Sequence, residues 1–246
     1  MIRPALITFV VTHALAAQPL SFVTCPILRD TKTVPCWLAE YEGELYYLGV
    51  QDDPERSSAL PQQSHELLVE AVVRPGPRVC GGLPLEIQAT SVMPELTRSC
   101  NTVLPAKDGI EAPAGRTPAA DATQVAETPV SPGYQPREFT VGFDFDSDQI
   151  SVRSMEVVAR AARWASTVHA ANLRLTAGRG ASLLSDGRVL TENEFIASRR
   201  STRIAAALKG LGIAAISVDI AAENMPASRN GITGPASRRV VISVMP

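Results

Sequence analysis

Three short segments of the 246-residue chain combine arginine, acidic and small polar side chains at close spacing. Residues 143–147 read Phe-Asp-Phe-Asp-Ser, residues 193–201 contain an Asn followed by an Arg-Arg pair, and residues 237–242 read Ser-Arg-Arg-Val-Val-Ile. A guanidinium can hold a carboxylate through two parallel hydrogen bonds. Residues 138–246 carry 13 Lys and Arg against 10 Asp and Glu. This excess favours an anionic or carboxylate-bearing ligand, the alternative being a solvated basic surface.

The elements that must position these segments alternate between strand and helix patterns. Apolar residues recur at helical spacing between residues 154 and 169, and again between 192 and 211. Short apolar runs lie before, between and after these helices. The order β-α-β-α-β-β predicts a sheet with both helices on one face. The predicted strands are 139–145, 173–177, 215–220 and 239–244.

Residues 137–246 resemble the OmpA-like domain, a peptidoglycan-binding module of bacterial envelopes, through the three segments described above. The resemblance implies binding of the peptidoglycan stem peptide, whose diaminopimelate carries a carboxylate and an amine. It assigns Arg200 as the carboxylate anchor, with Asn193, Asp146 and Ser147 lining the same pocket.

One part of the family pattern is missing. The family usually has Gly-His-Thr-Asp after the second strand, and its Asp engages the ligand amine. Residues 177–180 here read Ala-Gly-Arg-Gly, so Arg179 stands in a loop without a carboxylate. Asp186 is the candidate replacement, although Asp186-Gly187 is also typical of a plain turn. Arg179 would repel an amine and favour a second anionic group.

The N-terminal part of the chain, residues 18–104, reads as short strands, with a hairpin turning at Glu42-Gly43. About five such strands predict a small OB-like barrel or a sandwich. All four cysteines lie in this part, which predicts two disulfides in an exported protein. The pairs Cys25–Cys36 and Cys80–Cys100 are favoured because each brackets a local hairpin. A four-cysteine zinc site is the alternative, but its usual C-x2-C spacing is missing.

The remaining segments predict export and a tether. Residues 1–17 have a positive start, a short apolar run and small residues at 14–16, as a cleaved signal peptide does. Residues 105–136 are rich in Ala, Pro, Thr and Gly, which predicts a flexible linker. No other apolar run approaches the roughly 18 residues of a membrane span. With the resemblance, export implies the periplasm of a Gram-negative bacterium.

Two functions follow from these observations. The first is non-covalent attachment to peptidoglycan through Arg200, and the second is a protein–protein adaptor whose OmpA-like domain no longer binds the stem peptide. A formal charge of -2 favours neither nucleic acid nor membrane surfaces as partners. Asp144, Asp146 and Asp148 resemble the start of a calcium loop, but Gln149 and Met155 replace its Gly and Glu. No catalytic or cofactor motif is recognisable, so the sequence predicts a binding protein without a cofactor.

Overall fold

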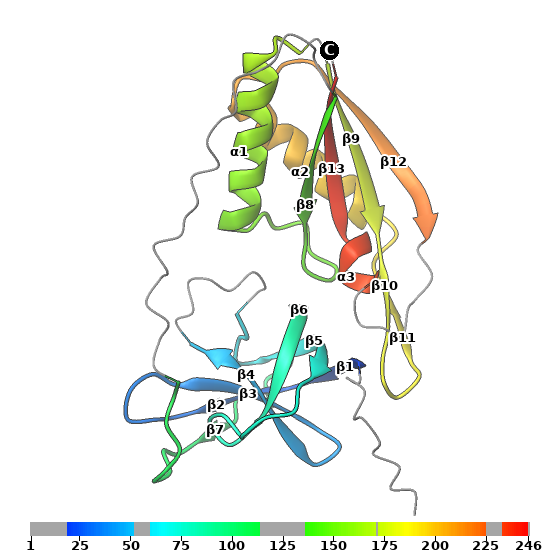
Figure 1. Cartoon of the computed structure of the whole chain (residues 1–246). Coiled ribbons are helices and arrows are strands. Elements are labelled where there is room, and N and C mark those ends of the chain that lie inside the picture. Colours follow the sequence, from blue (N-terminus) through cyan, green and yellow to red (C-terminus); the bar gives the residue numbers. More distant parts are fainter. Residues whose placement is uncertain (1–18, 52–59, 114–135, 171, 225–232, 246) are drawn as a thin grey trace, which may run out of the picture.

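A computed structural model describes residues 19–51, 60–113, 136–170, 172–224 and 233–245 of the chain. The predicted signal peptide and most of the predicted linker lie outside these residues. The described residues form two units, an N-terminal unit of strands β1 to β7 and a C-terminal unit that contains all three helices (Figure 1). This mixed α and β content agrees with the predicted fold class. No described helix combines the length and the apolar character that crossing a bilayer would require.

The strands of the N-terminal unit hydrogen-bond in one sheet of order β1-β5-β6-β4-β3-β2-β7. The predicted hairpin between β3 and β4 turns at Glu42 and Gly43, which both have positive φ angles, as a tight two-residue turn requires. The predicted OB-like barrel is not established by this strand order. The strands are β1 (Pro19–Thr24), β2 (Pro26–Arg29), β3 (Cys36–Tyr41), β4 (Glu44–Val50), β5 (His65–Val73), β6 (Leu83–Leu96) and β7 (Val103–Leu104).

Two disulfides hold this sheet, but not in the predicted pairs. Cys25 bonds Cys100 and Cys36 bonds Cys80, across 75 and 44 residues of sequence. The prediction of local pairs was wrong because sheet order, rather than distance along the chain, decides which cysteines meet. Cys25 follows β1 and Cys100 follows β6, and both strands pair with β5. Because all four cysteines are bridged, the zinc alternative is excluded.

The C-terminal unit is a four-stranded sheet of order β12-β9-β13-β8, with both long helices on one face as predicted. One core joins alternating strand residues such as Leu173 and Leu175 to Val158 of α1 and Leu208 of α2. The elements are β8 (Arg137–Gly142), α1 (Val152–Thr167), β9 (Asn172–Arg179), β10 (Ala181–Leu183), β11 (Val189–Thr191), α2 (Ile196–Gly210), β12 (Ile216–Asn224), α3 (Thr233–Ser237) and β13 (Arg239–Met245). The β10–β11 hairpin and α3 are additions that the sequence pattern did not predict.

The two units pack against each other, at the end of the C-terminal sheet from which β10–β11 projects (Figure 1). Phe145 packs with Leu68 of β5 and with Leu184, and its backbone N–H donates to the hydroxyl of Ser91. The backbone N–H and C=O of Ser21 on edge strand β1 both bond to Ser185. Apolar packing and hydrogen bonds therefore both hold the N-terminal unit in place.

A buried ion pair lies within this contact. The Glu70 carboxylate of β5 accepts from Arg238, which precedes β13, and both side chains are only 1% exposed. The second Glu70 oxygen accepts from the Ser182 hydroxyl at 2.7 Å. Removing one partner of such a pair leaves an uncompensated charge in a dry site.

We expect disulfide mapping to find Cys25 linked to Cys100 and Cys36 linked to Cys80. Non-reducing peptide digestion with mass spectrometry measures this directly, and a Cys25–Cys36 peptide would contradict the fold of the N-terminal unit. Replacing Cys25→Ser and Cys100→Ser together should lower the free energy of unfolding by about 3–5 kcal/mol, because the bridge closes a long loop.

We expect Glu70→Gln to lower the free energy of unfolding by about 3 kcal/mol, because the buried Arg238 guanidinium loses its counter-charge. Urea unfolding of the whole chain measures the loss. Glu66→Gln, on the same strand but only partly buried, is the matched control and should stay within about 0.5 kcal/mol of the original chain. Equal effects of the two changes would refute a role for the pair in joining the units.

Candidate functional site

The loop that follows β8 carries the first motif segment into the end of the C-terminal unit. Within it Asp146 adopts a left-handed backbone with φ of 52°, a conformation that costs energy for a residue other than glycine. Two hydrogen bonds hold Asp146 there: its N–H donates to Oε1 of Glu192, and its Oδ1 accepts from the N–H of Asn193, each at 2.8 Å. The loop is thus tied to the segment that leads from β11 into α2.

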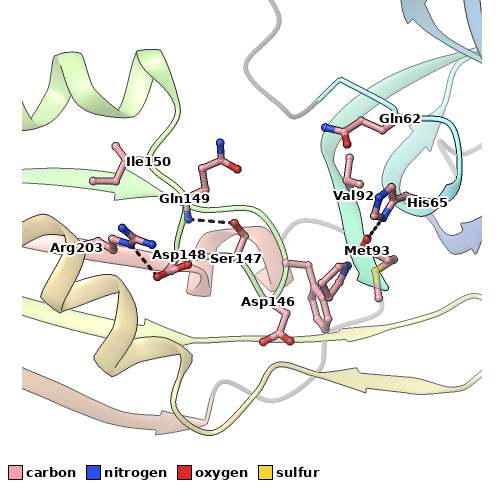
Figure 2. Close-up of a pocket in the computed structure, with 12 residues that line it drawn as sticks. Gln62, His65, Val92, Met93, Asp146, Ser147, Asp148, Gln149, Ile150 and Arg203 are labelled. Carbon is pink, nitrogen blue, oxygen red and sulfur yellow. Dashed lines mark hydrogen bonds and ion pairs between the residues drawn. The ribbon is translucent and has the colours of Figure 1, made fainter. Parts of the chain in front are cut away.

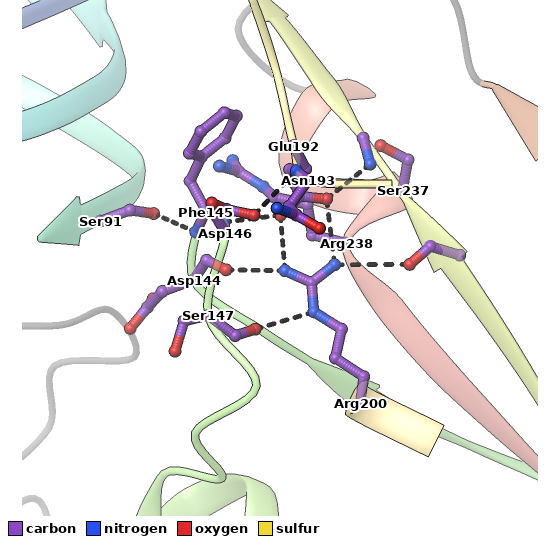
Figure 3. Close-up of polar contacts among 12 residues, drawn as sticks. Ser91, Asp144, Phe145, Asp146, Ser147, Glu192, Asn193, Arg200, Ser237 and Arg238 are labelled. Carbon is purple, nitrogen blue, oxygen red and sulfur yellow. Dashed lines mark hydrogen bonds and ion pairs between the residues drawn. The ribbon is translucent and has the colours of Figure 1, made fainter. Parts of the chain in front are cut away.

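Arg200 lies on the first turns of α2 and is completely buried. Its Nε donates to the carbonyl of Ser147 at 2.9 Å. Its two Nη atoms donate to the carbonyls of Gly178 and Asp144, at 3.4 and 2.9 Å. Both Nη atoms also donate to the two oxygens of Glu192 (Figure 3). Since a guanidinium has five N–H groups, these five contacts engage every donor that Arg200 has.

Glu192 is the counter-charge and is only 2% exposed. Besides the two bonds from Arg200, its carboxylate accepts from the backbone N–H of Asp146 and, at 2.6 Å, from that of Gly180. The Phe143 ring lies 5.1 Å from the guanidinium carbon and covers it on another side. The pair is therefore bidentate, desolvated and fully hydrogen-bonded, which is the arrangement in which a buried ion pair is tolerated.

Four residues that the resemblance assigned to a ligand pocket do come together here. Asp146, Ser147, Asn193 and Arg200 are joined by the contacts described above (Figure 3). Ser147 contributes its carbonyl to Arg200, while its hydroxyl accepts from the N–H of Gln149. The Asn193 side chain accepts from the N–H of Phe195. Each of these polar groups serves the protein itself.

The other two predicted residues are not among the groups that contact Arg200. Asp186 lies in the turn between β10 and β11, where the N–H and the guanidinium of Arg188 both donate to it. These hydrogen bonds hold the pKa of the Asp186 carboxyl below its ordinary value. Arg179 is at the end of β9, opposite Asn224 of β12 in the strand register. As a replacement for the carboxylate of the family, Asp186 would have to face Arg200, but its described hydrogen bonds go to Arg188 instead.

Sequence reasoning missed Glu192, the residue that decides the chemistry of the site. The apolar pattern placed it at the start of the predicted helix 192–211, whereas α2 begins at Ile196. The four residues before α2 lie outside the helix, and in this segment Glu192 and Asn193 bond to Asp146 of the loop after β8. A carboxylate eight positions ahead of a buried arginine was the available signal, but spacing alone could not show that the two meet.

The calcium interpretation of Asp144, Asp146 and Asp148 finds no support. Asp146 accepts from Asn193, and Asp148 pairs with Arg203 at 3.1 Å. Within the described ranges, no group of three or more His, Cys, Asp or Glu side chains is arranged to hold a metal ion.

We expect Glu192→Gln to destabilise the chain by about 3 kcal/mol, because it keeps the shape of the side chain but removes the charge that balances the buried Arg200. Urea unfolding is the measurement. Glu194→Gln, two residues along and exposed, should change stability by less than about 0.5 kcal/mol. If Glu192→Gln behaved like this control, the pair would be solvated in solution and Arg200 would be accessible.

No protein-family model matches the chain, and no curated protein matches it. Among solved structures, the OmpA-like domain of FopA1 from Francisella tularensis is 14% identical, with a TM-score of 0.34 over 44% of this chain and 71% of that one. The peptidoglycan-associated lipoprotein from Burkholderia pseudomallei is 15% identical, with a TM-score of 0.33 over 43% and 88%. The periplasmic domain of Helicobacter pylori MotB is 16% identical, with a TM-score of 0.33 over 44% and 75%. At these values the likenesses identify no family for the chain.

Proposed function

We propose that this is an exported protein of the bacterial cell envelope, related in role to the peptidoglycan-associated OmpA-like proteins, that acts as a protein–protein adaptor. The proposal rests on one observation: the hydrogen-bond donors of Arg200 are already engaged by groups of the protein itself. The Glu192 carboxylate takes the two guanidinium donors that a stem-peptide carboxylate would need. The role is one of binding, without a cofactor or a catalytic step.

The cost of opening this site supports the proposal. A ligand carboxylate can reach Arg200 only after Glu192 leaves, and breaking a buried pair costs about 3–5 kcal/mol. That cost lowers the apparent affinity of the ligand roughly 10²- to 10⁴-fold. The affinity for peptidoglycan of a site that depended on Arg200 would be lower by that factor.

The contacts made by the first and last motif segments support the proposal as well. Phe145 of the first segment and Arg238 of the last are both buried against the N-terminal unit. Two of the positions that carry the OmpA-like resemblance thus help to hold the two units together. Two disulfides suit the oxidising compartment in which an exported protein would work.

Direct binding of peptidoglycan is the second candidate, favoured by one observation. Asp146, Ser147, Asn193 and Arg200, which the resemblance assigned to the ligand, are neighbours in space. For this candidate, Glu192 must be displaced when the wall is bound, with Arg179 or Asp186 supplying further contacts. The two candidates differ in whether sacculi retain the protein.

Co-sedimentation of the whole secreted chain with purified diaminopimelate-type sacculi tests the proposal. We expect no pelleting beyond that of a protein without wall affinity, and no effect of added free stem peptide, because the donors of Arg200 are engaged. Arg199→Ala, at an exposed neighbouring position, should behave like the original chain. Pelleting that free stem peptide abolishes would establish direct wall binding and refute the adaptor.

A further inference from the structure

A cleft of about 690 Å³ lies between the two units. One wall is formed by residues 145–150 and Arg203 of the C-terminal unit (Figure 2). The other consists of Gln62, His65 and residues 92–94 of the N-terminal unit. The interface that contains Glu70, Arg238 and Phe145 fixes these walls relative to each other. The cleft is therefore preorganised, which reduces the entropy lost on binding.

Two of the polar side chains that line the cleft are carboxamides. Gln62 and Gln149 reach toward the space from opposite walls (Figure 2). Each carboxamide offers both donors and an acceptor, which complements the N–H and C=O of a peptide group. The Gln149 backbone N–H donates to the Ser147 hydroxyl at 3.1 Å, which shapes the loop that presents the side chain.

His65 adds a polar group of fixed orientation. Its Nδ1 lies 2.9 Å from the carbonyl oxygen of Met93. Because a carbonyl only accepts, Nδ1 must carry the hydrogen. This hydrogen bond fixes the orientation of the imidazole ring in the wall of the cleft.

The charges of the cleft disfavour an anionic ligand. Its walls carry Asp146 and Asp148 against the single guanidinium of Arg203, which pairs with Asp148. The excess of one carboxylate complements a basic group. The same excess opposes the carboxylates of a peptidoglycan stem peptide.

Apolar side chains complete the surface. Val92, Met93 and Ile150 line the cleft. Beyond them, Leu96 at the end of β6 is 61% exposed, and Val152 at the start of α1 is 84% exposed. Apolar side chains in the walls of a polar cleft, with an exposed apolar residue two positions further along each wall segment, are characteristic of a protein-binding surface.

We propose that this cleft binds a segment of a partner protein in which a basic side chain lies among apolar ones. The two carboxamides would bond the backbone of the segment, the excess negative charge of the cleft walls would attract its basic group, and Val92, Met93 and Ile150 would pack on its apolar side chains. This inference rests on the adaptor function and identifies the surface that carries it.

Selection of random peptides displayed on phage against the immobilised whole chain tests the cleft. Selected peptides, synthesised with a fluorescent label, are titrated by anisotropy. We expect enrichment of sequences with Lys or Arg beside apolar residues. Gln149→Ala and Gln62→Ala should each weaken binding about tenfold, because each removes hydrogen bonds to the backbone of the peptide.

Gln63→Ala is the matched control, since Gln63 is the exposed neighbour of Gln62 and does not line the cleft. It should bind as the original chain does. The cleft proposal is overturned if no peptides are enriched, if the three glutamine variants bind alike, or if acidic sequences dominate. Displacement of the labelled peptide by free stem peptide would instead assign the cleft to the wall. The sacculus experiment does not depend on this selection, so failure of the cleft leaves the adaptor proposal separately testable.

Discussion

The buried pair of Arg200 and Glu192 is the interaction on which the end of the C-terminal unit that carries residues 143–147 depends. A guanidinium removed from water must bond every donor, and Arg200 does so with three backbone carbonyls and one carboxylate. Those acceptors come from the loop after β8, the end of β9 and the end of β11. One side chain thus fixes three segments against α2. Through Glu192 it also holds the strained backbone of Asp146.

A second buried pair, Arg238 with Glu70, joins the two units but is less completely satisfied. Nε and Nη1 of Arg238 have no hydrogen-bond partner among the described residues, whereas every donor of Arg200 is engaged. Unmet donors in a buried site cost about 1–3 kcal/mol each. The Phe145 ring, 5.6 Å from the Arg238 guanidinium, offsets part of this cost. The Arg238–Glu70 pair is therefore less fully hydrogen-bonded than the network around Arg200.

Periodicity was enough to predict the sheet and the two helices of the C-terminal unit, because Leu173, Leu175 and Val158 follow the spacing of one buried face. The β3–β4 turn was predictable from Glu42-Gly43 for a similarly local reason. The disulfide pairs were not, because Cys25 and Cys100 meet only once the order of the strands is known. The role of Arg200 came from resemblance alone, and the residue that changes this role, Glu192, lay inside a segment that read as helix.

The partners of Arg200 also explain why a binding function would shift to the cleft between the units. Glu192 is attached to the same chain and held by two backbone N–H groups, so it competes for the guanidinium at a high effective concentration. A ligand carboxylate must overcome that competition, and it gains only the bonds that Glu192 gives up. Among the described residues, no carboxylate competes in this way for Gln62 and Gln149, and these side chains face the open space of the cleft (Figure 2). The same buried pair that, on our proposal, denies Arg200 to a wall ligand supports the loop that forms one wall of the cleft.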